Sequence, residues 1–250
     1  MLKVANRTLE VLEFICDSPD KEFSVKELSK KFEVDKASIF RTLRVLTARG
    51  YLQQNERAGN YSLGLKLPEL GAKVTAKIGL LDVIFPYMQK ISQEINETIN
   101  FAVMESTNIV YLHKIESSHF LRTDLLPGTS IPAYCSALGK AMLAWYEKEE
   151  VEKRYLPDVF KPRTAKTLVT IESFLKELQN IRETGYAVDD EEFIMGITCV
   201  AAPILNQNRK AIAAISVAGP TIRIQQKIPE IGARVSFYAR EISKCFGCRD

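Results

Sequence analysis

A cluster of guanidinium and hydroxyl side chains in residues 36–52 has the chemistry to contact a polyanion. Ser38, Arg41 and Arg44 recur at helical spacing, so they share one face of a predicted helix. Guanidinium groups bind phosphates and guanine edges, and small hydroxylated residues allow close approach. This combination is typical of a helix that enters the major groove of DNA. An ordinary surface helix with solvated charges is the alternative interpretation.

Two short helices with a tight connection must position these side chains. Ser24 and Glu27 have the spacing of a capping box at the start of the first helix, and Asp35 is the predicted cap of the second. Gly50 is expected to end the second helix, which spans residues 36–49. The apolar residues of the second helix fall on the face opposite to the arginines: Ile39, Leu43 and Leu46.

A preceding helix and a following β-hairpin are expected to complete a small domain over residues 1–66. The first helix is predicted to bury Leu9, Leu12 and Ile15. Two short alternating runs between residues 51 and 64 surround a polar tip, so they predict a wing whose Arg57 and Asn60 reach DNA. A surface hairpin that only closes the core is the alternative. The predicted DNA-contacting residues are Ser24, Lys36, Ala37, Ser38, Phe40, Arg41, Thr42, Arg44, Arg57 and Asn60.

The distribution of charge supports the same interpretation. Residues 1–66 carry 12 Lys/Arg and 9 Asp/Glu, whereas residues 67–250 carry 22 of each, so the net charge of +3 lies with the predicted helix-turn-helix. The 250 residues and 46% hydrophobic content are those of a globular protein with two domains. The sequence has no apolar run of membrane-spanning length and no signal peptide, so we expect a cytoplasmic protein without a membrane partner.

Cysteine and histidine residues are the candidates for catalysis or metal binding. Cys199 with His113 or His119 could act as nucleophile and base, or bind zinc, but no spacing in the sequence supports such a pairing. Cys245 and Cys248 form one CxxC pair, whereas structural zinc takes four ligands. We therefore expect no catalytic residue, no metal and no cofactor. A zinc- or thiol-dependent enzyme using Cys199, His113 and His119 remains the alternative.

Residues 67–250 are predicted to form a linker helix (67–79) and a second domain (80–250). That domain opens with a helix at 80–95, which Pro86 is expected to kink or restart. Strands and helices then intermingle, which is typical of an α+β sheet domain. The predicted strands are 98–104, 109–115, 120–125, 198–205 and 211–218, and the predicted helices are 137–146, 171–184 and 228–246.

A ligand site is predicted where one of these helices begins. Ser136 precedes the helix, so the backbone N–H groups of Ala137, Leu138 and Gly139 would be free to bind an anion. Strand alternation predicts a floor of small residues, although such residues could equally serve only helix packing. The floor would consist of Ala214, Ser216 and Ala218, with Cys199 and Ala201 on the facing strand. In the acidic run 189–192, alternation from Tyr186 and Val188 would turn Asp190 inward and Asp189 outward.

Several segments, in the same order, resemble the IclR family of bacterial transcriptional regulators. They are K-x-S-I-F-R-T-L-x-x-L-x-x-R-G-Y-L (36–52), Y-S-L-G-L-K-L-x-E-L-G (61–71), P-A-Y-C-S-A-L-G-K-A-M-L-A (132–144), R-E-T-G-Y-A-V-D-D-E-E (182–192) and G-I-T-C-V-A-A-P-I (196–204). The resemblance implies a winged helix-turn-helix, a linker helix and a GAF-like, PAS-related effector-binding domain that also mediates oligomerisation. The effector-contacting positions that it implies are Phe120, Thr123, Ala137, Leu138, Asp189, Cys199 and Ser216, whereas Ala218 stands where the family often has Ser.

The expected function is therefore a ligand-responsive DNA-binding regulator. The resemblance favours a repressor that self-associates as a dimer or a dimer of dimers on a roughly palindromic operator. The predicted effector is a small organic molecule, most simply a carboxylate, whose binding shifts the population of two arrangements of the DNA-binding domains.

Overall fold

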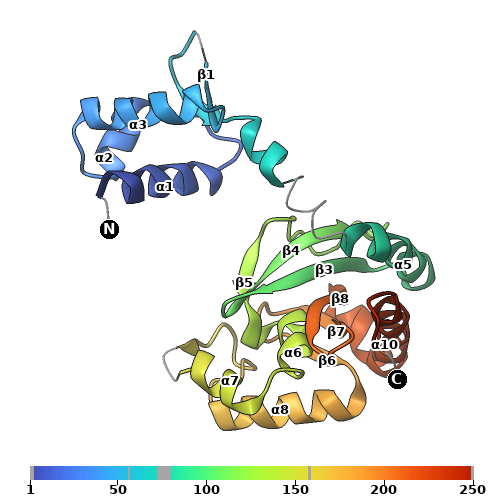
Figure 1. Cartoon of the computed structure of the whole chain (residues 1–250). Coiled ribbons are helices and arrows are strands. Elements are labelled where there is room, and N and C mark those ends of the chain that lie inside the picture. The colour runs from blue at the N-terminus through green and yellow to red at the C-terminus, as the bar shows by residue number, and fades with distance from the viewer. Residues whose placement is uncertain (1–2, 56, 72–79, 157–158, 249–250) are drawn as a thin grey trace. The chain divides into compact units, whose positions relative to one another are not determined.

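A computed structural model describes residues 3–55, 57–71, 80–156 and 159–248, and the chain divides into two compact units, Met1–Ile78 and Gly79–Asp250 (Figure 1). The predicted linker helix, 67–79, ends at the boundary between the two units. Residues 66–71 are helical, and the remainder of that prediction, 72–79, lies outside the described residues. Each unit has a hydrophobic core of its own.

The first unit is a winged helix-turn-helix. Its elements are α1 (Lys3–Cys16), α2 (Val25–Lys31), α3 (Lys36–Ala48), β1 (Leu52–Gln54) and β2 (Tyr61–Leu63). The predicted caps are present, because Ser24 and Glu27 form a capping box on α2 and the Asp35 carboxylate accepts the Ser38 N–H at 2.9 Å on α3. β1 and β2 pair antiparallel as the predicted wing, and the Gly50 φ of +78° ends the helical path.

The core of the first unit confirms the predicted stripe of α3 and corrects that of α1. Ile39, Leu43 and Leu46 are buried. On α1, however, the fully buried residues are Val11 and Ile15, while Leu9 is 57% exposed. α1 carries apolar residues on two sides, so its sequence alone does not show which side meets α3.

The second unit is built on one antiparallel sheet with the order β5-β4-β3-β8-β7-β6. Its strands are β3 (Thr98–Glu105), β4 (Asn108–Ile115), β5 (Ser130–Pro132), β6 (Ala187–Asp190), β7 (Ile197–Leu205) and β8 (Ala211–Pro220). The predicted α+β class is confirmed. The predicted strand 120–125 is wrong, because that segment is a loop in which Phe120 is fully exposed and Leu121 is 64% exposed.

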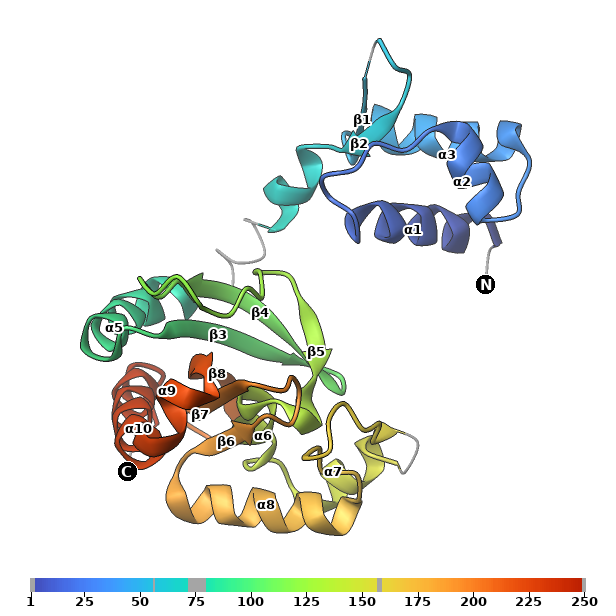
Figure 2. The ribbon, with the colours of Figure 1, turned by 180° about the vertical axis from the view of Figure 1, so that it is seen from behind.

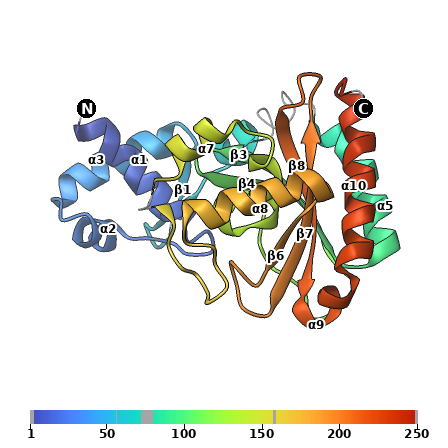
Figure 3. The ribbon, with the colours of Figure 1, turned by 90° about the horizontal axis from the view of Figure 1, so that it is seen from below.

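Helices cover both faces of this sheet (Figures 2 and 3). α5 (Leu80–Ile95) and α10 (Ile228–Cys245) pack on one face, and α5 runs through Pro86 as a single helix rather than restarting there. α6 (Ala137–Leu143), α7 (Lys148–Arg154) and α8 (Ile171–Thr184) belong to the other side. A short helix, α9 (Thr221–Ile224), follows β8. Among the described residues, no helix has the length and apolar character needed to cross a bilayer.

Candidate DNA-contacting helix and ligand cavity

The exposed face of α3 carries the side chains that were predicted to contact DNA. Lys36, Ala37, Arg41 and Arg44 are exposed, and Phe40 is 44% exposed beside them. The Arg41 guanidinium donates to the Ser38 hydroxyl at 3.3 Å, and α3 itself contains no acidic residue. This face is therefore cationic and open.

Two members of the predicted set already have structural roles. Thr42 is only 8% exposed and its hydroxyl donates to the Ser38 carbonyl at 3.2 Å. The prediction that Thr42 belongs to the DNA-contacting surface is therefore wrong. The Ser24 hydroxyl is held by Glu27 within the capping box. At the wing, Arg57 is exposed at the tip, where its backbone N–H donates to Asn55, and Asn60 is half-buried beside it.

A cavity of about 290 Å³ lies in the second unit, between the sheet, the start of α6 and two loops. Of the eight predicted effector-contacting residues, six line this cavity: Thr123, Ala137, Leu138, Asp189, Cys199 and Ser216. Phe120 and Gly139 do not. Phe120 points into solvent, and Gly139 packs so tightly on Ala133 that an added Cβ would lie 2.2 Å from the Ala133 oxygen.

The start of α6 is less open to an anion than its sequence suggests. The Ser136 hydroxyl caps the helix by accepting the Gly139 N–H at 3.1 Å, so this N–H is not free for a ligand. α6 has only seven residues, and all seven are buried. The prediction of three free N–H groups at this position is therefore wrong for Gly139.

The inner wall of the cavity holds a polar residue that sequence reasoning missed. Asn100 on β3 is 3% exposed and lies directly opposite Ser216 on β8, so both side chains are on the same face of the sheet. Its Oδ1 has no hydrogen-bond partner among the described residues, and neither does the hydroxyl of Thr98 two residues earlier. Buried polar groups are normally paired. An asparagine within an otherwise apolar strand was the signal that could have identified this position.

Asp189 is the buried acid of the cavity. It is 4% exposed, and its Oδ1 accepts the backbone N–H groups of Glu192 and Phe193 at 2.7 and 3.3 Å. Burial raises the pKa of Asp189 to about 7, although Lys140 opposes this shift. Asp190 instead faces outward and pairs with Lys166 at 3.0 Å. The expectation from alternation is therefore wrong, because β6 buries Ala187 and Asp189 on the cavity side and leaves Val188 and Asp190 half-buried on the other side.

A buried lysine stands behind this acid and anchors the loop that follows it. Lys140 on α6 is fully buried, and its ammonium pairs with Glu192 and, at 3.5 Å, with Glu177 on α8. The hydroxyl of Thr167 donates to the Glu192 carbonyl at 2.7 Å. The acidic run is thus held on several sides, and the loop continues into Phe193 and Ile194, which line the cavity.

The candidate residues for catalysis do not assemble. Cys199 lies on the cavity face. His113 pairs in register with Phe101, whose side chain belongs to the core on the opposite face, and its ring meets that of Phe85 of α5 edge to face with 5.2 Å between centroids. Burial raises the pKa of the Cys199 thiol well above its usual value, which disfavours the nucleophilic thiolate. Within the described parts of the chain, no group of three or more His, Cys, Asp or Glu side chains could hold a metal ion.

Comparisons with known proteins agree with this arrangement. The family model described as "Bacterial transcriptional regulator IclR C-terminal" matches residues 72–244, and a MarR family model matches residues 4–60. The regulator KdgR of Escherichia coli K12 is 33% identical over 92% of this chain and 88% of its own length. The transcriptional repressor IclR of the same organism is 29% identical over 96% and 89%. The crystal structure of Thermotoga maritima IclR superposes with a TM-score of 0.82 at 28% identity, covering 99% of this chain and 100% of its own.

Proposed function

The chain belongs to the IclR family of bacterial transcriptional regulators, and we propose that α3 reads operator DNA while the cavity of the second unit binds the carboxylate effector that controls this binding. The protein is a transcriptional regulator and not an enzyme. The observation that carries the proposal is that the chain combines an open, cationic α3 with a cavity whose lining is mainly apolar with a few polar groups. We place its action on DNA in the cytoplasm, as a repressor.

Self-association follows from the size of the DNA-reading surface. One winged unit reads only a short half-site, so a dimer, or a dimer of dimers, on a roughly palindromic operator is expected.

Replacing the arginines of α3 tests the DNA-reading half of the proposal. Arg41→Ala and Arg44→Ala are each expected to weaken binding to the native upstream region by about 1–3 kcal/mol, roughly 5- to 150-fold, if the guanidinium reads a base edge. A phosphate contact would instead weaken all sequences alike and reduce the salt dependence. Fluorescence anisotropy at two salt concentrations distinguishes the two cases. Arg234→Ala on α10 is the matched control, and unchanged affinity in both α3 variants would rule out the assignment.

The effector half of the proposal rests on Arg122, a cationic residue that lines the cavity. Arg122 lines the cavity from its loop with 39% of its side chain exposed, so it stands at the mouth, where it can meet a carboxylate. Its guanidinium lies 3.0 Å from a carboxylate oxygen of Glu116. Thermal-shift measurements against panels of organic, sugar and aromatic acids test the class, because a ligand that binds only the folded state raises Tm. No shift with any acid would contradict it.

Asn100 is expected to select for a hydroxyl on the effector. Its amide presents donor and acceptor groups, and a ligand hydroxyl can serve either, whereas a methylene leaves the amide unpaired. Asn100→Leu, which keeps the shape of the side chain, should weaken binding of a hydroxylated acid about tenfold and leave its non-hydroxylated counterpart unchanged. Calorimetry with gluconate and hexanoate measures both. Asn180→Leu, exposed on α8, is the control, and equal losses for both acids would exclude this role.

A further inference from the structure

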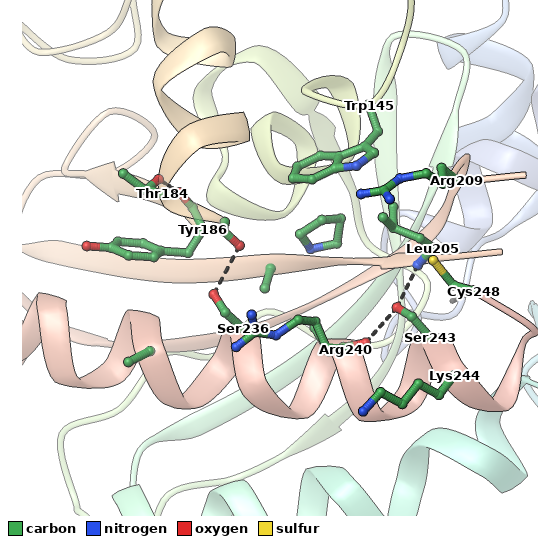
Figure 4. Close-up of a pocket in the computed structure, with 15 residues that line it drawn as sticks. Trp145, Thr184, Tyr186, Leu205, Arg209, Ser236, Arg240, Ser243, Lys244 and Cys248 are labelled. Carbon is green, nitrogen blue, oxygen red and sulfur yellow. Dashed lines mark hydrogen bonds between the residues drawn. The ribbon is translucent and has the colours of Figure 1, made fainter. Parts of the chain in front are cut away.

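A second concavity, of about 380 Å³, lies at the open edge of the sheet beside α10 (Figure 4). β6 pairs with β7 only at residues 198–201, so residues 202–205 of β7 have no β6 partner on that side. The C-terminal half of α10 forms the opposite wall. None of the residues that line this groove lines the cavity described above.

The groove does not offer the backbone donors that a peptide strand would need. Pro203 has no N–H. The Leu205 N–H donates to the Ser243 hydroxyl at 2.9 Å, and that hydroxyl donates in turn to Ala239. On α10, Ser236 donates to the Gly185 carbonyl at 3.0 Å in the same way. Recognition in this groove therefore depends on side chains rather than on strand addition.

The side chains of the groove combine an apolar floor with cationic edges. Trp145 stands over one end, where Figure 4 shows the Arg209 guanidinium next to its ring. Arg240 and Lys244 extend along α10 on the other side, and Lys244 also pairs with Glu241 at 2.8 Å. No Asp or Glu belongs to the lining. The groove is thus complementary to an anion with a flat apolar body.

Arg209 adopts an unfavourable backbone conformation at this position. It lies in the turn between β7 and β8 with a φ of +56°, and its N–H donates to the Asn206 carbonyl at 2.9 Å. Positive φ is uncommon for residues other than glycine, asparagine and aspartate. A glycine would relieve the backbone but would remove the guanidinium from beside Trp145, which is consistent with a role for that group.

We propose that this groove is a second small-molecule site, which takes an aromatic carboxylate. The ring lies against Trp145 and the floor formed by Ala202 and Leu205, and the carboxylate is held by Arg209 and Arg240. The volume of the groove is within the range of small-ligand sites. The site is distinct from the cavity, because the two share no lining residue.

The single tryptophan of the chain makes the proposal directly measurable. Titration of the full-length protein with benzoate, excited at 295 nm, is expected to change Trp145 emission saturably. Benzamide, which has the same ring and no charge, should bind about tenfold more weakly or worse. Arg209→Gln and Arg240→Gln should each weaken benzoate about tenfold. An absent or non-saturable change, or equal binding of benzamide, would overturn the proposal.

A variant of the other cavity shows which site is being reported. In Ser216→Ala, the emission change with benzoate is expected to keep its wild-type midpoint, because Ser216 does not line the groove. If Ser216→Ala abolished the change while Arg209→Gln and Arg240→Gln left it intact, benzoate would be binding in the cavity and the groove assignment would be wrong.

Discussion

Replacing Lys140 with methionine is expected to destabilise the second unit by about 3–5 kcal/mol, because it leaves the buried Glu192 without a countercharge. Lys140 is fully buried and pairs with both Glu192 and Glu177. Burial raises the pKa of Glu192, while the attraction of Lys140 lowers it, so loss of the lysine forces Glu192 to take up a proton or remain as an unpaired charge. Urea unfolding, analysed for two units, measures the effect.

Two further variants test whether the loss of stability comes from the unpaired buried charge or from replacement of a lysine by methionine. Lys148→Met removes an exposed lysine whose pair with Glu152 at 3.7 Å lies at the surface, and it should cost less than about 1 kcal/mol. Lys140→Met combined with Glu192→Gln removes both charges and should recover part of the lost stability. If Lys140→Met unfolded at the wild-type urea concentration, the buried network would have no part in stabilising the unit.

Affinity for a carboxylate effector is expected to fall about tenfold for each pH unit above 7, because an ionised Asp189 would repel the ligand in a buried site. The pKa of Asp189 is raised to about 7 by burial, so Asp189 keeps its proton, or takes one up, when a carboxylate binds beside it. Calorimetry between pH 6 and pH 9 measures the slope. Asp189→Asn stays neutral and should flatten it, whereas an unchanged slope in this variant would refute the assignment.

The neutral groups that face Asp189 do not account for such a slope. Lys140 and Glu192 are the charged neighbours, whereas Cys199 lies opposite Asp189 on β7 and Tyr111 lines the same cavity. The pKa values of Tyr111 and Cys199 are raised by burial, so both stay neutral up to pH 9. The same shift affects folding. Because the folded-state pKa of Asp189 is raised, its stabilising contribution is complete below its unfolded pKa and is lost as pH rises through about 7.

The features that could be predicted from sequence are those determined by neighbouring residues. The caps at Ser24 and Asp35 and the buried stripe of α3 depend on residues three or four positions apart, and all are present. Asp189 and Asp190 could not be assigned to faces from the sequence, since the preceding apolar residues of β6, Ala187 and Val188, lie on opposite faces of the strand. Lys140 was missed because its partners lie 37 and 52 residues further along the chain.

The loop at 120–125 is a second case in which the local sequence did not predict the structure. The segment was predicted as a strand, yet Phe120 and Leu121 face solvent while Thr123 and Leu125 line the cavity. A short run with apolar residues at both ends can form a strand or a loop over a cavity, and only the order of the sheet shows that this segment is not one of its strands.

The two surfaces that define the protein are encoded by separate parts of its gene. The residues of α3 and the wing end at residue 63, and every residue that lines the cavity falls between 100 and 218. A single recombination event between these stretches could therefore give an existing operator a new chemical signal, or an existing signal a new set of genes. Such regulators can diversify when one coding stretch is joined to a different second stretch, with neither surface changed.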